Sequence, residues 1–253
     1  MKMLREQTVF GPIRSRRLGN SLGINLLPVN GKLCNFDCIY CECGWNADGR
    51  ADRTLPSLSD VESALDSALR KCRSEGTGID SITFSGDGEP TLNPEFPQIV
   101  DKVLSLRDKL YPDAKVSVLS NATTVSNPDI LAALRKVDNP IMKIDAPTDA
   151  LVSQVNRPTG RYSIEKVVSS LEAFNGDFIL QTMFLKSPSY DSSEPDFLSG
   201  WMDIVRRLGP REIMVYTIDR PTPMQDLRKF TENQMRELVQ PLVDEGFKIQ
   251  IKG

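Results

Sequence analysis

The sequence predicts an α/β fold built around a parallel sheet. After residue 55, short runs rich in β-branched and apolar residues alternate with stretches whose apolar residues recur at helical spacing. This alternation is typical of parallel strands joined by right-handed helical crossovers. Six strand–helix units fit either an open doubly wound sheet or an incomplete barrel. The length of 253 residues suits one such domain.

Six strands are expected, each a short apolar run ahead of a helical stretch: residues 22–28, 79–85, 115–120, 140–145, 177–185 and 212–218. Start signals mark the first four helices. Ser59 and Glu62 have the spacing of a capping box, Asn93 and Asn127 each precede a proline, and Ser163 opens the fourth helix.

The C-terminal part of the chain carries two further helical patterns. Phe197, Trp201 and Val205 share one face of the fifth helix, and Gly209–Pro210 ends it. A sixth helix is expected over 231–245, because Thr231 is followed three residues later by a glutamine. A last short strand is expected over 247–251.

Polar residues gather directly after the predicted strands rather than being spread evenly. In parallel α/β folds the carboxyl ends of the strands form the edge at which ligands bind. The sequence therefore predicts a binding site at this edge, although loops are polar in any case. The segments concerned are Gly86–Pro90, Ser120–Asn121, Lys143, Asp145 and Asp219–Arg220.

Composition excludes several classes of function. The chain has 31 basic and 34 acidic residues, a net charge of −3, which argues against a general nucleic-acid coat protein. It contains no histidine, so Ser-His-Asp and Cys-His catalysis and histidine-ligated zinc are excluded. No apolar stretch has the length of a signal peptide or a membrane span. We therefore expect a cytoplasmic protein without membrane contact.

The strongest chemical signal is a group of cysteines after the first predicted strand. Cys34, Cys38 and Cys41 have C-x3-C-x2-C spacing, and Cys43 follows. Thiolates are the usual ligands of iron–sulfur clusters, and three of them leave one iron of a four-iron cluster open. Alternatives are a four-thiolate zinc site, an electron carrier in which Cys43 is the fourth ligand, and free thiols. Cys72 lies on an apolar helix face and is expected in the core.

The cysteine motif, with an aromatic residue at Tyr40, resembles the hallmark of the radical S-adenosylmethionine (SAM) superfamily. The resemblance covers nearly the whole chain. Within the superfamily, the sequence is similar to an uncharacterised branch that itself resembles the wyosine-type tRNA-modifying enzymes. It implies an incomplete (βα)6 TIM-like barrel in one domain, 1–253, with an N-terminal segment 1–21, a barrel core 22–218 and a C-terminal extension 219–253. The segments that carry it are 11–28, 85–94, 119–123, 143–147 and 156–160.

The resemblance also implies cofactors and their ligands. It implies that Cys34, Cys38 and Cys41 hold a [4Fe–4S] cluster whose open iron binds SAM. The protein would bind and orient the reactants while the cofactors supply a 5′-deoxyadenosyl radical that abstracts hydrogen from an unknown substrate. The residues implied to contact SAM are Tyr40, Gly88, Glu89, Asn121 and Lys143. Asp87 stands where the family more often has glycine, so no role is assigned to it.

The resemblance leaves the partners open. A flavodoxin or ferredoxin is implied as reductant. Transfer RNA is a possible substrate by analogy, but the net charge does not favour it. Arg14, Arg16 and Arg17 are either a solvated edge or a clamp for an anionic substrate over the barrel mouth, and Arg157 and Arg220 are candidates for the same task. Outside this family, a zinc-binding interaction protein and an iron–sulfur electron carrier are the alternatives.

Overall fold

A computed structural model describes residues 7–15, 17–48 and 52–253. Its main sheet has eight strands, and β1 and β2 at one edge are antiparallel while all other neighbours are parallel. β1 and β11 are the two edges, so the sheet is an open half-barrel and the predicted incomplete parallel barrel is confirmed. In spatial order the strands are β1 (Val9–Ser15), β2 (Gly19–Ile24), β3 (Ser81–Phe84), β4 (Lys115–Ser120), β5 (Asn139–Lys143), β6 (Ile179–Met183), β9 (Glu212–Tyr216) and β11 (Ile249–Lys252).

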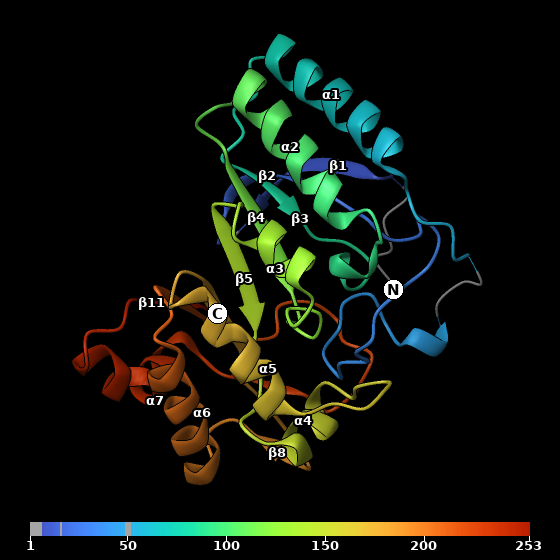
Figure 1. The fold of residues 1–253 in the computed structure, drawn as a ribbon. Helices are drawn as coiled ribbons and strands as arrows, with labels where there is room; N and C mark the ends of the chain where they lie inside the picture. The colour runs from blue at the N-terminus through green and yellow to red at the C-terminus, as the bar shows by residue number, and fades with distance from the viewer. Residues whose placement is uncertain (1–6, 16, 49–51) are drawn as a thin grey trace.

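Helices follow most of the parallel strands, and Figure 1 shows α1 and α2 lying side by side on one part of the sheet. The α-helices are α1 (Leu58–Ser74), α2 (Phe96–Leu110), α3 (Pro128–Leu134), α4 (Asp149–Val155), α5 (Ile164–Leu171), α6 (Pro195–Leu208) and α7 (Glu232–Asp244). The 3-10 helices are η1 (Asn46–Asp48), η2 (Pro90–Leu92) and η3 (Glu172–Phe174). A small antiparallel sheet contains β7 (Leu185–Ser187), β8 (Tyr190–Asp191) and β10 (Arg228–Lys229).

Two helix starts differ from the sequence prediction. The capping box of α1 is formed by Ser57 and Asp60, not by Ser59. α2 begins at Phe96 rather than after Asn93. The side-chain oxygen of Asn93 accepts from the Glu95 N–H (2.9 Å), ahead of the helix, and its NH2 group donates to the carbonyls of Leu26 (3.1 Å) and Pro56 (3.0 Å). The starts expected at residues 127, 163 and 231 are confirmed.

Ser57→Ala is expected to lower the free energy of unfolding by about 1 kcal/mol, because it removes the acceptor for the backbone N–H of Asp60. Ser59→Ala is the matched control, since Ser59 lies in the same turn without capping it. Urea unfolding followed by far-ultraviolet circular dichroism measures both changes. Equal losses in the two variants would contradict the observed cap.

The N-terminal hairpin of β1 and β2 was not expected from the sequence. β2 begins at Gly19, three residues before the predicted strand and inside the segment expected to precede the barrel. The turn places Leu18 against an inner cluster of Ile141, Ile179 and Met214 on β5, β6 and β9. The hairpin therefore contributes a side chain to the interior of the half-barrel.

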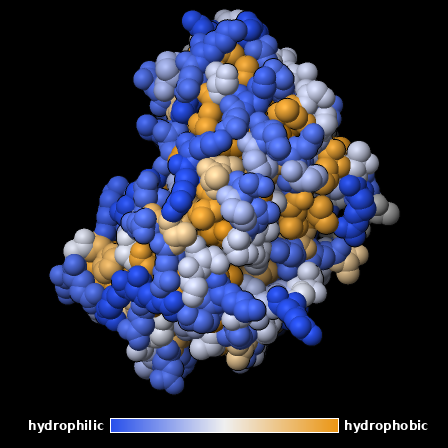
Figure 2. Space-filling model, in the orientation of Figure 1, coloured by the Kyte–Doolittle hydropathy of each residue, from blue (hydrophilic) through white to orange (hydrophobic). Residues whose placement is uncertain are grey.

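The large hydrophobic core lies between the helices and the sheet and includes Cys72, as predicted. The face drawn in Figure 2 is mostly hydrophilic, with apolar patches scattered over it. Among the described residues, Ile13 and Val243 are the large apolar side chains that are clearly exposed. None of the helices in the described ranges has the length and apolar character that a membrane crossing requires.

Candidate functional site

All eight residues singled out by the resemblance line one cavity of about 280 Å³. The cavity lies at the carboxyl ends of β3, β4, β5 and β9, with the cysteine loop as one wall. The eight are Cys34, Cys38, Tyr40, Cys41, Gly88, Glu89, Asn121 and Lys143. The predicted clustering of polar residues at this edge is thus observed.

Two neighbouring segments hold the cysteine loop by backbone hydrogen bonds. Leu33 pairs with Gly88 in a parallel bridge, donating to the Asp87 carbonyl (3.0 Å) and accepting from the Glu89 N–H (3.1 Å). On the other side, Phe36 pairs with Pro158. The loop is therefore fixed at both sides of the cavity before any ligand binds.

Gly88 serves this anchoring. Its φ is +142°, and a Cβ at this position would overlap the carbonyl oxygen of Leu33. The resemblance implies that Gly88 contacts SAM. The structure shows a further reason for glycine, the close approach of the Leu33 carbonyl.

Gly88→Ala is expected to cost about 3 kcal/mol or more of unfolding free energy, because backbone strain adds to a clash with a fixed carbonyl. Gly76→Ala is the matched control: Gly76 also has a positive φ, +66°, but a Cβ there would meet open space. It should cost only about 1 kcal/mol. Urea unfolding compares the two, and similar losses would show that the Leu33 contact is not the reason for glycine.

The cysteine thiols lie in different environments. Burial raises the pKa of Cys34, and it raises the pKa of Cys38 to about 11. A hydrogen bond from Cys43 lowers the pKa of Cys41 to about 6 against the effect of burial. Donors face two of the sulfurs: the amide of Asn156 lies 3.3 Å from Cys38 Sγ, and the backbone N–H of Phe36 lies 3.4 Å from Cys34 Sγ.

Lys32 places a buried positive charge behind the cysteine loop. Its side chain is only 1% exposed, and Nζ donates to the carbonyl of Gly44 (2.6 Å) and to Asp37 (3.3 Å). Burial alone would lower its pKa, but the negative charges of Cys41, Cys34 and Asp37 outweigh burial and raise it. Lys32 therefore favours thiolates at this loop, and the sequence analysis did not identify it.

The donor set fits an iron–sulfur cluster. Among the described residues, no three Cys, Asp or Glu side chains surround one point closely enough to ligate a single ion. Cys34, Cys38 and Cys41 nevertheless line the same cavity, which suits a larger group that takes each thiolate at a separate iron. A closed zinc site would require the thiolates around one ion.

Tyr40, Lys143 and Asp145 form a buried network beneath the cavity. Lys143 Nζ donates to the hydroxyls of Tyr216 (2.6 Å) and Tyr40 (2.8 Å) and lies 3.8 Å from Asp145 Oδ2. The hydroxyl of Tyr40 donates to Asp145. Burial alone would lower the pKa of Lys143, but Asp145 and Tyr216 outweigh it and raise the pKa. The charged side chain of Lys143 thus forms part of the cavity wall, and its contacts with Tyr216, Tyr40 and Asp145 fix its position.

Glu89 and Asn121 form the opposite wall. Glu89 is 2% exposed and accepts from the hydroxyls of Thr91 (2.6 Å) and Ser120 (2.9 Å) and from the backbone N–H of Asn121 (2.7 Å). Burial raises the pKa of Glu89, and these donors oppose the increase. Asn121 in turn donates to Asn35 (2.6 Å). The two carboxylate oxygens of Glu89 therefore fix the loop that carries Asn121, one through Ser120 and the other through the backbone of Asn121.

The arginines do not form one clamp. Arg14 is exposed on β1, and Arg16 lies outside the described residues. Arg17 lines the cavity from below, with its guanidinium stacked 4.5 Å from the ring centre of Tyr216. Arg157 lies over the ring of Trp45, and Arg220 pairs with Glu42 at 2.8 Å. Of the two alternatives, the exposure of Arg14 fits a solvated edge, whereas Arg17 lines the cavity.

Three side chains of the site gave no signal of their own in the sequence. Asn156 donates to Cys38, Tyr40 and Asp145, Gln181 lines the cavity from β6, and Lys32 lies behind the loop. Asn156 belongs to one of the segments that carry the resemblance, but nothing in its spacing pointed to the cysteines. Its contacts arise because α4 ends beside the cysteine loop.

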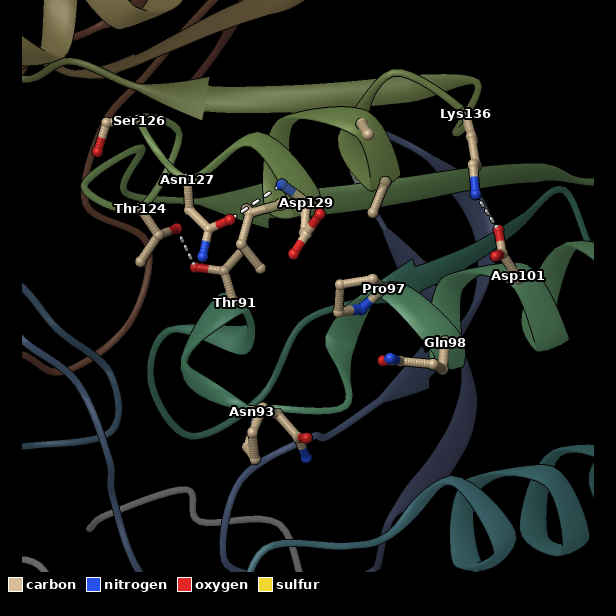
Figure 3. Close-up of a pocket in the computed structure, with 14 residues that line it drawn as sticks. Thr91, Asn93, Pro97, Gln98, Asp101, Thr124, Ser126, Asn127, Asp129 and Lys136 are labelled. Atoms are coloured by element: carbon tan, nitrogen blue, oxygen red, sulfur yellow. Dashed lines mark hydrogen bonds and ion pairs between the residues drawn. The ribbon is translucent and has the colours of Figure 1, made fainter.

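A larger hollow of about 600 Å³ lies between the start of α2 and α3, away from the cysteines (Figure 3). Its polar side chains bond to one another: Lys136 pairs with Asp101 at 2.7 Å, and Thr91 bonds to Thr124 at 2.6 Å. It contains no thiol. The cysteine cavity is therefore the candidate site on chemical grounds, although it is smaller.

Comparison with known proteins agrees with the geometry. A family model of the Radical SAM superfamily matches residues 31–180, more than half of the chain. A UPF0026 protein of Methanocaldococcus jannaschii is 30% identical over 84% of this chain and 64% of its own length. The GTPase Obg of Brachyspira hyodysenteriae is 26% identical over 92% of this chain and 33% of its own length. The chain thus spans less than two thirds of either relative.

Solved structures share the fold at low sequence identity. A radical SAM methyltransferase from Sphaerobacter thermophilus superposes with a TM-score of 0.69 and 15% identity, over 91% of this chain and 65% of that one. SuiB of Streptococcus suis bound to S-adenosylmethionine gives 0.64 and 15%, over 88% of this chain and 49% of that one. At such identities the likeness concerns the fold alone.

Proposed function

Because the chain belongs to the radical SAM superfamily, we propose that it is a radical SAM enzyme acting on a substrate still to be identified. One observation carries the proposal: three thiols at C-x3-C-x2-C spacing share one cavity with the five other residues that the resemblance implies. The five cysteines are free, which fits a reducing compartment such as the cytoplasm.

In this proposal Cys34, Cys38 and Cys41 hold a [4Fe–4S] cluster. With SAM bound, such a cluster would supply one electron for cleavage of the sulfonium, and the resulting 5′-deoxyadenosyl radical would take a hydrogen atom from the substrate. A low-potential reductant such as a flavodoxin or a ferredoxin supplies the electron. The work of the protein itself is binding, orientation and exclusion of water.

Several side chains and backbone contacts of the chain contribute to this binding and orientation. The bridge between Leu33 and Gly88 fixes the cysteine loop, and Lys32 offsets its negative charge. Tyr40, held by Lys143 and Asp145, offers a rigid aromatic surface at the base of the cavity. The Glu89 carboxylate fixes the loop of Asn121, so we expect backbone carbonyls of 86–90, rather than Glu89 itself, to accept from the amino group of SAM.

Electron paramagnetic resonance of the reduced, anaerobically reconstituted protein tests this proposal. We expect a [4Fe–4S]⁺ signal that changes shape when SAM is added, because SAM occupies the open iron. A cluster signal indifferent to SAM would favour an electron carrier. Zinc binding without any cluster would overturn the enzyme assignment in favour of a zinc-binding interaction protein.

A further inference from the structure

The cavity contains two buried donors that the radical chemistry does not use. Arg17 Nη1 and Gln181 Nε2 are buried and have no hydrogen-bond partner among the described residues. Both residues line the cavity, and Gln181 is only 4% exposed. A buried donor without an acceptor costs about 1–3 kcal/mol, more when it is charged. A ligand that supplies an acceptor to each donor would remove this cost.

Their positions are set by rigid elements. Gln181 is in the middle of β6, in register with Lys143 on β5 and Met214 on β9. Arg17 precedes Leu18, which packs into the interior of the half-barrel, and its guanidinium is stacked on Tyr216. Stacking orients the planar guanidinium and leaves its N–H edge available for an acceptor. The two donors therefore belong to the inner wall of the cavity, formed by the strands and the hairpin.

The charges around the cavity favour an anion at this wall. Arg17 brings a positive charge to it, and Lys143 brings a second one that Asp145 offsets at 3.8 Å. The carboxylates that also line the cavity are already engaged, since Glu42 pairs with Arg220 and Glu89 accepts from three neighbouring residues. A guanidinium binds a carboxylate or a phosphate through two parallel N–H···O bonds, and an amide can add a third.

We propose that Arg17 and Gln181 bind an oxyanion, a carboxylate or a phosphate, of a small-molecule substrate. The inference rests on the proposed function and names the substrate class of the same site. A small molecule fits better than RNA because both donor atoms are buried in the inner wall of the cavity. Arg17 and Gln181 belong to the N-terminal hairpin and to β6, not to the cysteine loop, where the cluster and SAM are expected.

Titration calorimetry with succinate and with inorganic phosphate, on cluster-loaded protein saturated with SAM, tests the proposal. We expect at least one of the two anions to bind saturably, and Arg17→Gln to weaken that binding about tenfold or more, because the paired charge is lost. Gln181→Glu should weaken it further, since the new carboxylate repels the anion at the same wall. Arg14→Gln, an exposed arginine on the same hairpin, is the matched control and should bind as the unaltered protein does.

Separate readouts keep this inference apart from the proposed function. The SAM-dependent change in the paramagnetic resonance signal should persist in Arg17→Gln and Gln181→Glu, and its loss in both would assign these residues to SAM instead. Thermal unfolding shows whether each variant is folded, and Arg17→Lys, which keeps the charge, should restore part of the binding. The proposal is overturned if neither anion binds, if Arg17→Gln binds normally, or if only transfer RNA binds in a manner that depends on Arg17.

Discussion

Cys38→Ala is expected to abolish cluster assembly. The unaltered protein should take up about four iron atoms per chain on anaerobic reconstitution, and the variant less than about one, since a cluster with three protein ligands tolerates no loss. Cys38 is the sharpest choice because Asn156 holds its sulfur at 3.3 Å, so the ligand is already positioned. Iron analysis and visible absorption measure the effect, and Cys34→Ala and Cys41→Ala should behave in the same way.

Cys43→Ala is the matched control, because Cys43 is in the same loop but does not line the cavity. Its thiol lies near the carbonyl of Gly86 (3.8 Å), Asp87 (3.6 Å) and the sulfur of Cys41. It should retain the cluster and the response to SAM. Cys72→Ala, in the core, should retain both as well. Loss of the cluster in Cys43→Ala would make Cys43 a fourth ligand and favour the electron carrier. A full cluster in Cys38→Ala would contradict the ligand set.

The sequence predicted those parts of the site whose residues lie close together in the chain or directly after a strand. The spacing of Cys34, Cys38 and Cys41 lies within one loop, and residues 86–90 follow a strand directly, so both could be placed at one edge of a parallel sheet. Caps could be read where the side chain bonds within its own turn, as Thr231 does. Asn93 misled because its side-chain oxygen bonds to Glu95, ahead of the first turn of α2, while its NH2 group donates to Leu26 and Pro56, far away in the chain.

The remainder of the site depends on contacts between distant segments. Asn156 reaches Cys38 across 118 positions, and Tyr40 reaches Asp145 across 105. The position of Arg17 depends on a hairpin whose first strand, Val9–Ser15, lacked the alternating pattern of a half-buried strand. No local rule gives the direction of such a side chain, because the fold that brings the segments together has to be known first.

Asp145→Ala is expected to lower the free energy of unfolding by about 3 kcal/mol, because it removes the counter-charge of Lys143, whose side chain is only 19% exposed. Asp145 is 2% exposed and also accepts from Asn156 (2.6 Å) and from the backbone N–H of Met183 (2.9 Å), so the variant breaks several bonds at once. Urea unfolding at neutral pH measures the loss. Asp66→Ala, which removes an exposed pair with Arg70, is the control and should change stability little.

A double-mutant cycle separates the charge pair from these other bonds. Lys143→Met should cost less than Asp145→Ala, because Asp145 keeps its donors from Tyr40, Asn156 and Met183. In Lys143→Met/Asp145→Ala no lone charge stays buried, so the loss should be smaller than the sum of the two single losses. Strict additivity would show that Lys143 and Asp145 act independently. Coupling would show that the wall beneath the cysteines is one electrostatic unit, whose ion pair holds Tyr40 at the base of the cavity.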